Sequence, residues 1–262
     1  MKTEVLTDPR ELTPAWSRQY ERAARVFSDM LGKKSGRIAE IGCGNGQLTI
    51  PLAKRAPHVH FTLVDRFVGT NYYTNYRVLV GKLQKEKLRR RAVIVVSDYM
   101  KWLSKQDDNT FDAVISSEFI PEIDSGETHQ FIQECYRITK AEGATVHSFL
   151  SPLPRNHRQE LLITADSNPL WTHTPPKEWF SPPRELVLRE MRKSRFQRIQ
   201  QTTFRSRLIM KADAAKNWLK TGEMKASFYI KHKTELDESG LEVPDWVIVS
   251  GIKPRLPRGR SR

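Results

Sequence analysis

Short hydrophobic runs alternate with amphipathic stretches along the first 150 residues of the chain. Five runs rich in apolar and β-branched residues predict strands at 37–42, 59–65, 92–98, 111–117 and 144–150. Between them, the spacing of apolar residues predicts helices at 46–56, 72–88 and 127–139. Strands that alternate with helices are typical of βαβ units, so we expect an α/β fold with a mainly parallel sheet and helices on both faces. The run at 92–98 is apolar enough to predict a strand buried on both faces.

The N-terminal segment predicts a long amphipathic helix at residues 10–31, because its apolar side chains recur at intervals of three, four and seven residues. Thr13 is the expected N-cap, with Pro14 at the first helical position.

The pattern changes after residue 150. Residues 151–183 are rich in proline and aromatic residues and predict an insertion or a lid. Two further strands are expected at 196–210 and 245–252, separated by one or two helices in 212–239 that break near Gly222. We expect these two strands to form an antiparallel pair that closes one edge of a seven-stranded sheet, with helical or proline-rich insertions after strands five and six.

A glycine-rich turn, Glu40-Ile41-Gly42-Cys43-Gly44-Asn45-Gly46, lies between the first predicted strand and the first predicted helix after it. Glycines at such a turn let the backbone approach a ligand closely, and the helix N-terminus offers free N–H groups. The dinucleotide fingerprint would need Gly or Ala at position 47, where the chain has Gln47. A phosphate-binding P-loop is excluded as well, because no Gly-Lys-Ser/Thr sequence follows the turn.

Acidic residues end the next two predicted strands. Asp65 ends the second strand and is placed to accept hydrogen bonds from both ribose hydroxyls of a nucleoside. Asp98 ends the third strand, where a carboxylate can accept from an adenine amine while its neighbour Tyr99 covers the ring. Three successive strand ends therefore converge on the crevice in which such sheets bind nucleosides.

At these residues the chain resembles the class I, Rossmann-fold, S-adenosylmethionine-dependent methyltransferases. The matching segments are AEIGCGNGQLT, LVD, VSDY and FDAVISSEF, and the resemblance covers about residues 36–150 well. It implies that Glu40 lies near the methionine amine and that Gly42, Gly44 and Gly46 line the methionine and the ribose. It also implies that the positions of Asp65 and Asp98 bind ribose and adenine, and that 116–119 borders the methyl group.

The resemblance implies S-adenosyl-L-methionine as the cofactor and S-adenosyl-L-homocysteine as its product, with no metal. Relatives often use an N-terminal helix as a lid, which adds Tyr20 to the expected cofactor site. The predicted cofactor residues are Glu40, Gly42, Cys43, Gly44, Asn45, Gly46, Asp65, Arg66, Asp98, Tyr99, Ser116 and Tyr20.

Methyl transfer from a sulfonium is an in-line displacement, so alignment supplies most of the acceleration and a base is needed only for a protonated acceptor. Glu118, on the loop after the fourth strand, and His147, in the fifth strand, are the candidate bases. The alternatives are that Glu118 is a surface acid and that His147 is a buried structural histidine. His129 is more simply explained as a surface residue at the start of a helix.

The acceptor is expected to lie under the two insertions, because the Rossmann part is shared by enzymes with many different substrates. Their candidate acceptor residues are Trp171, His173, Trp179, Phe228 and Tyr229, with packing inside the insertions as the alternative. The loop after the fourth strand does not match the DNA amino-methyltransferase motif. The two cysteines do not match the pair used in pyrimidine C5-methylation.

The net charge of +14 on 262 residues is concentrated in three places: 82–91 carries +5, 184–211 carries +7, and 251–262 carries +5. Such stretches are either solvated faces or a surface for an anionic partner. With only two cysteines, the composition excludes a disulfide scaffold, a cysteine-ligated zinc site and a three-cysteine iron–sulfur cluster. No apolar run reaches the roughly 18 residues of a membrane span, and no signal segment is visible, so we expect a cytoplasmic protein.

Taken together, the sequence predicts one methyltransferase domain at 1–253 and a basic tail at 254–262. Its parts are a lid helix at 10–31, a cofactor-binding core at 36–150, and insertions at 151–183 and 212–240. The first hypothesis is a methyltransferase for a small or medium-sized acceptor, which the basic stretches allow to be anionic. An RNA methyltransferase that uses the basic stretches for tRNA or rRNA is the second, and a non-catalytic cofactor-binding protein the third. The oligomeric state stays open.

Overall fold

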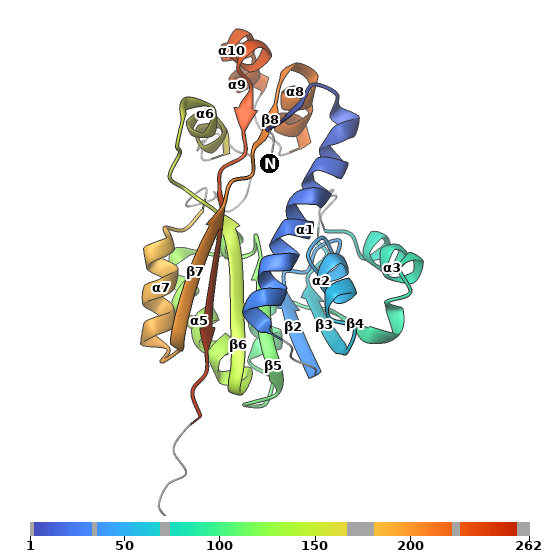
Figure 1. Cartoon of the computed structure of the whole chain (residues 1–262), viewed down its shortest axis with the longest axis vertical. Helices are drawn as coiled ribbons and strands as arrows, with labels where there is room; N and C mark the ends of the chain where they lie inside the picture. The colour runs from blue at the N-terminus through green and yellow to red at the C-terminus, as the bar shows by residue number, and fades with distance from the viewer. Residues whose placement is uncertain (1–2, 33–35, 69–73, 167–180, 222–225, 256–262) are drawn as a thin grey trace, which may run out of the picture.

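The computed structural model describes residues 3–32, 36–68, 74–166, 181–221 and 226–255 of the chain (Figure 1). Its main element is a seven-stranded sheet with the strand order β4-β3-β2-β5-β6-β10-β7. The bounds are β2 (Gly36–Ile41), β3 (Val59–Asp65), β4 (Ala92–Val96), β5 (Phe111–Ser117), β6 (Thr139–Leu150), β7 (Gln197–Phe204) and β10 (Trp246–Ile252). β10 runs antiparallel to both neighbours, and the pairs from β4 through β6 are parallel. The predicted fold class is therefore confirmed.

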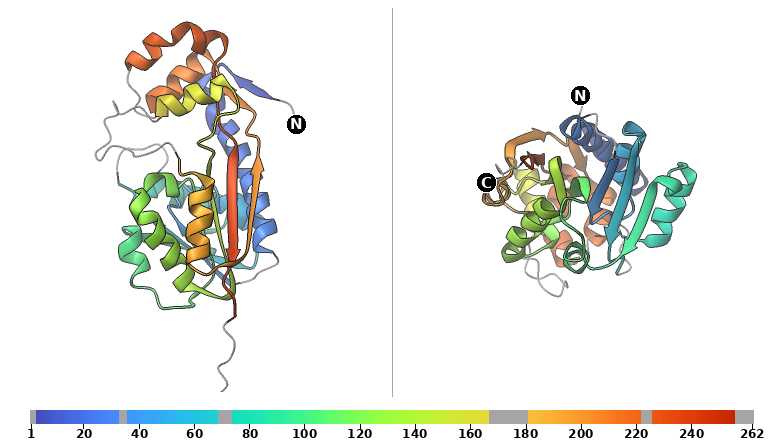
Figure 2. Two further views of the ribbon diagram at one scale, coloured as in Figure 1. Left: turned by 90° about the vertical axis from the view of Figure 1, so that its left-hand side faces the viewer. Right: turned by 90° about the horizontal axis from the view of Figure 1, so that it is seen from below.

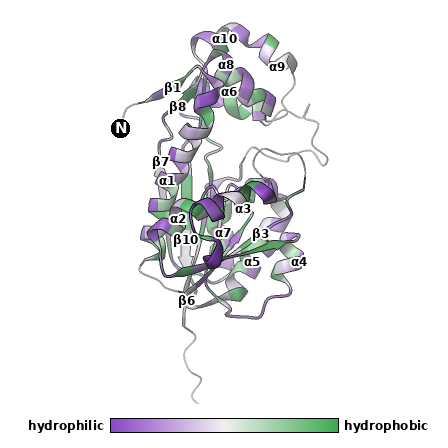
Figure 3. Ribbon diagram, turned by 90° about the vertical axis from the view of Figure 1, so that its right-hand side faces the viewer, coloured by the Kyte–Doolittle hydropathy of each residue, from purple (hydrophilic) through white to green (hydrophobic). Residues whose placement is uncertain are grey.

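Helices cover both faces of this sheet, as the left view of Figure 2 shows for α1 on one side and α5 and α7 on the other. One face packs against α1 (Leu12–Leu31), α2 (Thr49–Arg55) and α3 (Tyr76–Lys85), through a core that includes Phe27, Leu52 and Leu79. The other face packs against α4 (Tyr99–Leu103), α5 (Ser125–Ile138) and α7 (Arg184–Lys193), around Phe131 and Met191. In Figure 3, β3 is largely hydrophobic, while the helices on that side carry both hydrophilic and hydrophobic residues. This pattern is the one expected for amphipathic helices on a buried sheet.

A small lobe stands on the edge of the sheet at which the parallel strands end, here called the carboxyl edge (Figures 1 and 2). It contains a second sheet of three short strands, in the order β1-β8-β9, and four helices. The strands are β1 (Glu4–Leu6), β8 (Leu208–Met210) and β9 (Leu241–Glu242); the helices are α6 (His157–Asp166), α8 (Ala212–Thr221), α9 (Ala226–Lys231) and α10 (Lys233–Glu238). The lobe therefore combines the described N-terminal residues with the described parts of both predicted insertions. Short 3-10 helices lie at Pro9–Glu11, Arg89–Arg91 and Ile120–Glu122.

Charged contacts connect the helices of the small lobe to one another. His157 on α6 forms ion pairs through its two ring nitrogens, with Glu160 on its own helix at 3.2 Å and with Glu235 on α10. These two carboxylates, Glu160 foremost, raise the pKa of His157. Glu242 on β9 is buried and accepts a hydrogen bond from Asn156, just before α6, at 3.0 Å. Both sets of contacts hold α6 to the later part of the chain.

Three local expectations need correction. β4 is not buried on both faces, because it forms the edge of the sheet and leaves Val93 63% and Val96 62% exposed. The first long helix starts at Leu12 and is not capped by Thr13. It follows a 3-10 turn, whose N-cap Asp8 accepts the N–H of Arg10. A polar N-cap one turn earlier satisfies the first N–H groups before Thr13 is reached.

The predicted strand at 196–210 is in fact two strands that belong to different sheets. β7 ends at Phe204, and β8 starts at Leu208. Between them, Ser206 is buried and its carbonyl accepts the side-chain amide of Gln19 at 3.1 Å, while Arg207 has a φ of 54°. This bend carries the chain from the large sheet into the small lobe.

Candidate functional site

The glycine turn lies at the carboxyl edge, between β2 and α2. Gly42 and Cys43 donate their N–H groups to the carbonyl of Val64, at 2.9 and 3.2 Å, which ties the turn to the end of β3. Gly42 has a φ of 71°, and a Cβ atom there would lie 2.4 Å from the ring of Phe119, which follows β5. Only glycine fits this position without displacing the ring, and the turn after β5 packs directly on the glycine turn.

Asp65, the last residue of β3, holds the glycine turn through its side chain. One carboxylate oxygen accepts the N–H of Gly44 at 2.9 Å, and the other accepts the N–H of Phe67 at 2.8 Å. Each carboxylate oxygen has a further acceptor position, so both can still accept a ligand hydroxyl. The next residue, Arg66, is exposed.

Asp98 has a structural role beside its predicted one. Its Oδ1 caps α4 by accepting the N–H groups of Met100 and Lys101, at 3.0 and 3.1 Å. Its Oδ2 accepts no hydrogen bond from the residues that the structure describes. A single carboxylate can thus cap the helix with one oxygen and offer the other to a ligand.

Tyr99 stands between Asp98 and the turn after β5. Its ring packs edge-on against Phe119 and Phe131, with centroids 5.0 and 5.9 Å apart, and its hydroxyl donates to Glu127 at 2.8 Å. Burial, with the adjacent Glu127 carboxylate, raises the pKa of Tyr99, so the phenol stays protonated. The ring forms an aromatic wall next to the two strand-end acids.

Glu40, one residue before the end of β2, is almost completely buried. Its carboxylate accepts the hydroxyl of Thr49, on α2, at 2.6 Å. Burial raises the pKa of Glu40 to about 8, and the nearby Asp65 charge adds to the effect. The carboxyl group therefore lies behind the glycine turn. With a pKa of about 8, it is mostly protonated at pH 7.

Two other residues of the turn use their side chains to hold it. Cys43 is buried, and burial raises the pKa of its thiol well above the ordinary value. Asn45 is 4% exposed, and its side-chain oxygen accepts the N–H of Asn75 at 2.6 Å, immediately before α3. At these two positions the backbone, and not the side chain, is what the turn can offer to a ligand.

Ser116 and His147 form a buried pair across β5 and β6. The Ser116 hydroxyl lies 2.8 Å from Nδ1 of His147, and both residues are fully buried. Burial lowers the pKa of His147 to about 3, so the ring is neutral, and its Nε2 has no hydrogen-bond partner in the described part of the chain. The ring packs against Phe131, with centroids 5.5 Å apart. A base must reach its substrate, and this histidine lies inside the core.

Glu118, the other candidate base, lies at the carboxyl edge. It follows β5 with a φ of 55°, and its N–H donates to the carbonyl of Ser148 at 2.9 Å. His129 instead pairs with Glu190 at 2.8 Å and links α5 to α7.

Tyr20, a predicted cofactor residue, lies in an aromatic cluster. It packs edge-on against Trp246, with ring centroids 5.2 Å apart, and Trp16 and Phe204 complete the cluster. No local pattern predicts this cluster, because its members come from α1, β7 and β10. Phe228 is buried in the small lobe and Tyr229 is half-buried there; Trp171, His173 and Trp179 lie outside the described residues.

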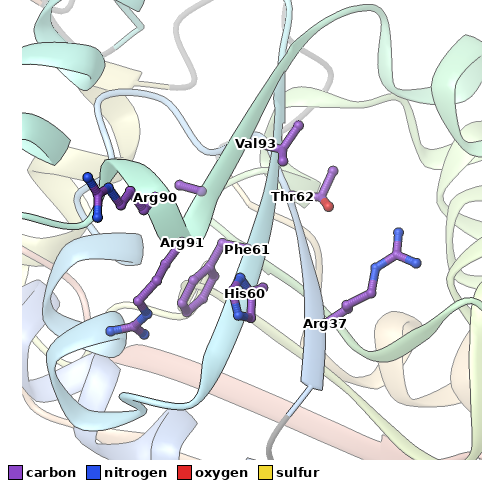
Figure 4. A pocket seen from close by; sticks show the side chains of 8 residues that line it. Arg37, His60, Phe61, Thr62, Arg90, Arg91 and Val93 are labelled. Carbon is purple, nitrogen blue, oxygen red and sulfur yellow. The ribbon is translucent and has the colours of Figure 1, made fainter.

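A surface depression at the opposite end of the sheet does not form a site (Figure 4). Its lining includes Arg37, His60, Arg90 and Arg91, but the side chains of Arg37 and Arg90 point away from each other. Among the described residues, no group of three or more His, Cys, Asp or Glu residues is arranged to hold a metal ion. None of the helices described is long and apolar enough to cross a membrane.

Comparisons with known proteins agree with this geometry. Residues 38–143 match the family model of a methyltransferase domain. A malonyl-[acyl-carrier protein] O-methyltransferase from Haemophilus ducreyi is 31% identical over 119 residues, which are 45% of this chain and 42% of that protein. The chain therefore matches less than half the length of this curated relative.

Solved structures support the fold. A SAM-dependent methyltransferase from Archaeoglobus fulgidus superposes with a TM-score of 0.56 at 16% identity, covering 90% of this chain and 94% of that one. Phosphoethanolamine N-methyltransferase 2 from Haemonchus contortus, in complex with S-adenosyl-L-methionine, has a TM-score of 0.58 at 15% identity, covering 93% and 57% of the two chains. At 15% and 16% identity, these similarities support the fold alone.

Proposed function

We propose that this chain, a member of the class I S-adenosylmethionine-dependent methyltransferases, transfers a methyl group to a small or medium-sized acceptor held between the carboxyl edge and the small lobe. One observation carries the proposal. The glycine turn, Asp65 and Asp98 come together at the carboxyl edge, and the small lobe stands on that same edge. The cofactor site and a structure able to enclose an acceptor are thus neighbours.

The residues at this edge fit the chemistry of the donor. When bound, S-adenosylmethionine supplies an electrophilic methyl group on its sulfonium. We assign the ribose hydroxyls to Asp65, whose oxygens keep free acceptor positions, and the adenine amine to Oδ2 of Asp98. The backbone at Gly42–Gly46 would lie along the methionine portion, with the Glu40 carboxyl behind it.

Alignment carries most of the catalysis in this proposal. The acceptor displaces S-adenosylhomocysteine in line, forming one bond to the methyl carbon as the carbon–sulfur bond breaks. We assign to Glu118, on the turn after β5, the role of taking a proton from a protonated acceptor. His147 is left out of the mechanism, because it is buried and its pKa of about 3 keeps it a neutral core residue. Ser116, bonded to it, is likewise assigned to the core.

Residues 89–91 and 253–255, from two of the three basic stretches, lie at the end of the sheet opposite the site, which favours the small acceptor over RNA there. The Arg89–Arg91 turn stands at the amino end of β4, where Arg91 donates to the carbonyl of Val59 at 3.1 Å. The segment after β10 leaves from the same end of the sheet, because β10 is antiparallel. The acceptor of the Haemophilus ducreyi relative is not carried over, since that match spans only 45% of this chain.

The test is transfer of a labelled methyl group. The protein is incubated with methyl-labelled S-adenosylmethionine and fractionated cell extract, and label is followed into small molecules, protein and RNA. We expect label in the small-molecule fraction, and loss of it with Asp65→Ala. Label that enters only RNA would overturn the assignment of the acceptor, and no transfer from a chain that binds the cofactor would favour a non-catalytic role.

A further inference from the structure

A group of cations lies at the end of the molecule opposite the carboxyl edge. Arg192 and Lys193 end α7, Arg195 and Arg198 flank the start of β7, and Arg255 follows β10. All five side chains belong to exposed residues. We call them the arginine patch.

The backbone brings these residues together. Ile252 of β10 pairs with Gln197 of β7, which places the segments after β10 and before β7 side by side. The Arg195 N–H donates to the carbonyl of Arg192 at 2.9 Å, so the turn after α7 is compact. A surface depression lined by Arg198, Arg255 and Glu142, among others, joins the two segments.

Most of this positive charge is not neutralised. Lys193 pairs with Glu190 at 3.1 Å, but the side chains of Arg192, Arg195, Arg198 and Arg255 form no ion pair within the described part of the chain. Glu142 is the acid within the patch. It accepts the backbone N–H of Arg255 at 3.2 Å. Four free guanidinium groups therefore face solvent together.

The patch is separate from the methyl-transfer site. β10 spans seven residues, and its first residue, Trp246, pairs with the last residue of β6 at the carboxyl edge. At about 3.4 Å per residue, its two ends are roughly 20 Å apart. A partner on the patch would thus be held without entering the proposed acceptor site.

We propose that the arginine patch binds the phosphate backbone of RNA, as a docking surface distinct from the site of methyl transfer. Arginine, which makes up four of the five cations, presents a planar fork that pairs with phosphate through two hydrogen bonds. The exposed amide of Gln200, two residues after Arg198 on β7, adds a donor and an acceptor. This inference does not depend on the proposed acceptor.

The test compares two charge-matched variants of the full chain by fluorescence anisotropy with a labelled 20-nucleotide RNA. The first is R192Q/R195Q/R198Q, and the control is R25Q/K220Q/K231Q, which removes three exposed cations elsewhere. We expect the first variant to bind at least about tenfold more weakly than wild type at 100 mM salt, and the control to stay within about twofold. Each phosphate contact to single-stranded nucleic acid contributes about −0.7 to the slope of log affinity against log salt. The slope for R192Q/R195Q/R198Q should therefore be shallower than the wild-type slope by about 2.

Calorimetry with S-adenosylmethionine on the same three proteins checks that the cofactor site is intact, and thermal unfolding checks the fold. RNA binding by a chain that fails to bind cofactor would support the patch while contradicting the proposed function. The inference is overturned if wild type binds no RNA at 50 mM salt, if both variants lose affinity equally, or if polyglutamate competes as well as unlabelled RNA.

Discussion

Gly42→Ala tests whether the turns after β2 and β5 are packed as the structure has them. An alanine Cβ would lie 2.4 Å from the Phe119 ring, and the ring would have to retreat by about 1 Å to reach ordinary contact. Overpacking of this kind costs about 1–3 kcal/mol. The φ of 71° adds about 1–2 kcal/mol for any residue other than glycine. The free energy of unfolding should therefore fall by roughly 2–5 kcal/mol.

The two parts of this cost can be separated with Phe119→Ala. In the double variant no ring remains to clash, so the Gly42→Ala penalty should shrink to its backbone part and the 3.0 Å approach to the Cβ of residue 119, which alanine keeps. Urea unfolding of the wild type, both single variants and the double variant should give a favourable coupling of about 1–3 kcal/mol. Gly81→Ala is the control, because a Cβ there meets nothing within 4 Å and alanine in a helix should stabilise by about 0.5–1 kcal/mol. Additive single effects, within about 0.5 kcal/mol, would refute the packing argument.

Three further predictions concern ionisable side chains. Asp98→Ser should keep the helix cap, and so the stability within about 0.5 kcal/mol, yet weaken S-adenosylmethionine binding in calorimetry. Glu40→Gln should stabilise the protein increasingly as the pH rises. Because the pKa of Glu40 is raised, the folded state keeps a proton that the unfolded state has lost. The free energy of unfolding of the wild type therefore falls by about 1.4 kcal/mol per pH unit between the ordinary pKa of a glutamate and about pH 8. His157→Gln should destabilise most at low pH. The contribution of His157 is complete below its ordinary pKa and is lost as pH rises through the raised folded pKa, as urea unfolding from pH 5.5 to 9 would show.

Each of these has a contrary result. Equal cofactor affinity in Asp98→Ser and wild type would remove Asp98 from the cofactor site. A pH-independent difference between Glu40→Gln and wild type would mean that the Glu40 carboxyl titrates normally. A His157→Gln effect that grows with pH would contradict the ion pairs between α6 and α10.

Local patterns predicted the large sheet well because its strands are long enough to show their periodicity. The structure places β3 at Val59–Asp65 and β5 at Phe111–Ser117, the predicted bounds. The second sheet was missed because its strands span two or three residues each, too few to show alternation. The bend at 205–207 was missed for a related reason. It depends on a long-range hydrogen bond from Gln19 to Ser206, for which a local pattern has no signal.

The candidate site shows the same division. Asp65 and Asp98 could be predicted, because the carboxyl ends of parallel strands meet at one edge. The role of His147 stayed open between a base and a buried structural histidine, since alternation along β6 does not distinguish a core residue from a site residue; the structure shows it buried. The contact of Phe119 with Gly42 joins residues 77 positions apart in the sequence, so only the fold shows it.

Cofactor binding at Asp65 tests the central claim most directly. Calorimetry should show saturable one-to-one binding of S-adenosylmethionine to the wild type, weakened in Asp65→Ala by about 1.5–3 kcal/mol for each charge-assisted hydrogen bond lost. Asp112→Ala is the matched control, since Asp112 also accepts a backbone N–H, that of Arg37 at 2.8 Å, but at the other end of the sheet. We expect Asp112→Ala to bind S-adenosylmethionine with near wild-type affinity. A folded wild type that binds no S-adenosylmethionine, or an Asp65→Ala variant with unchanged affinity, would contradict the central claim.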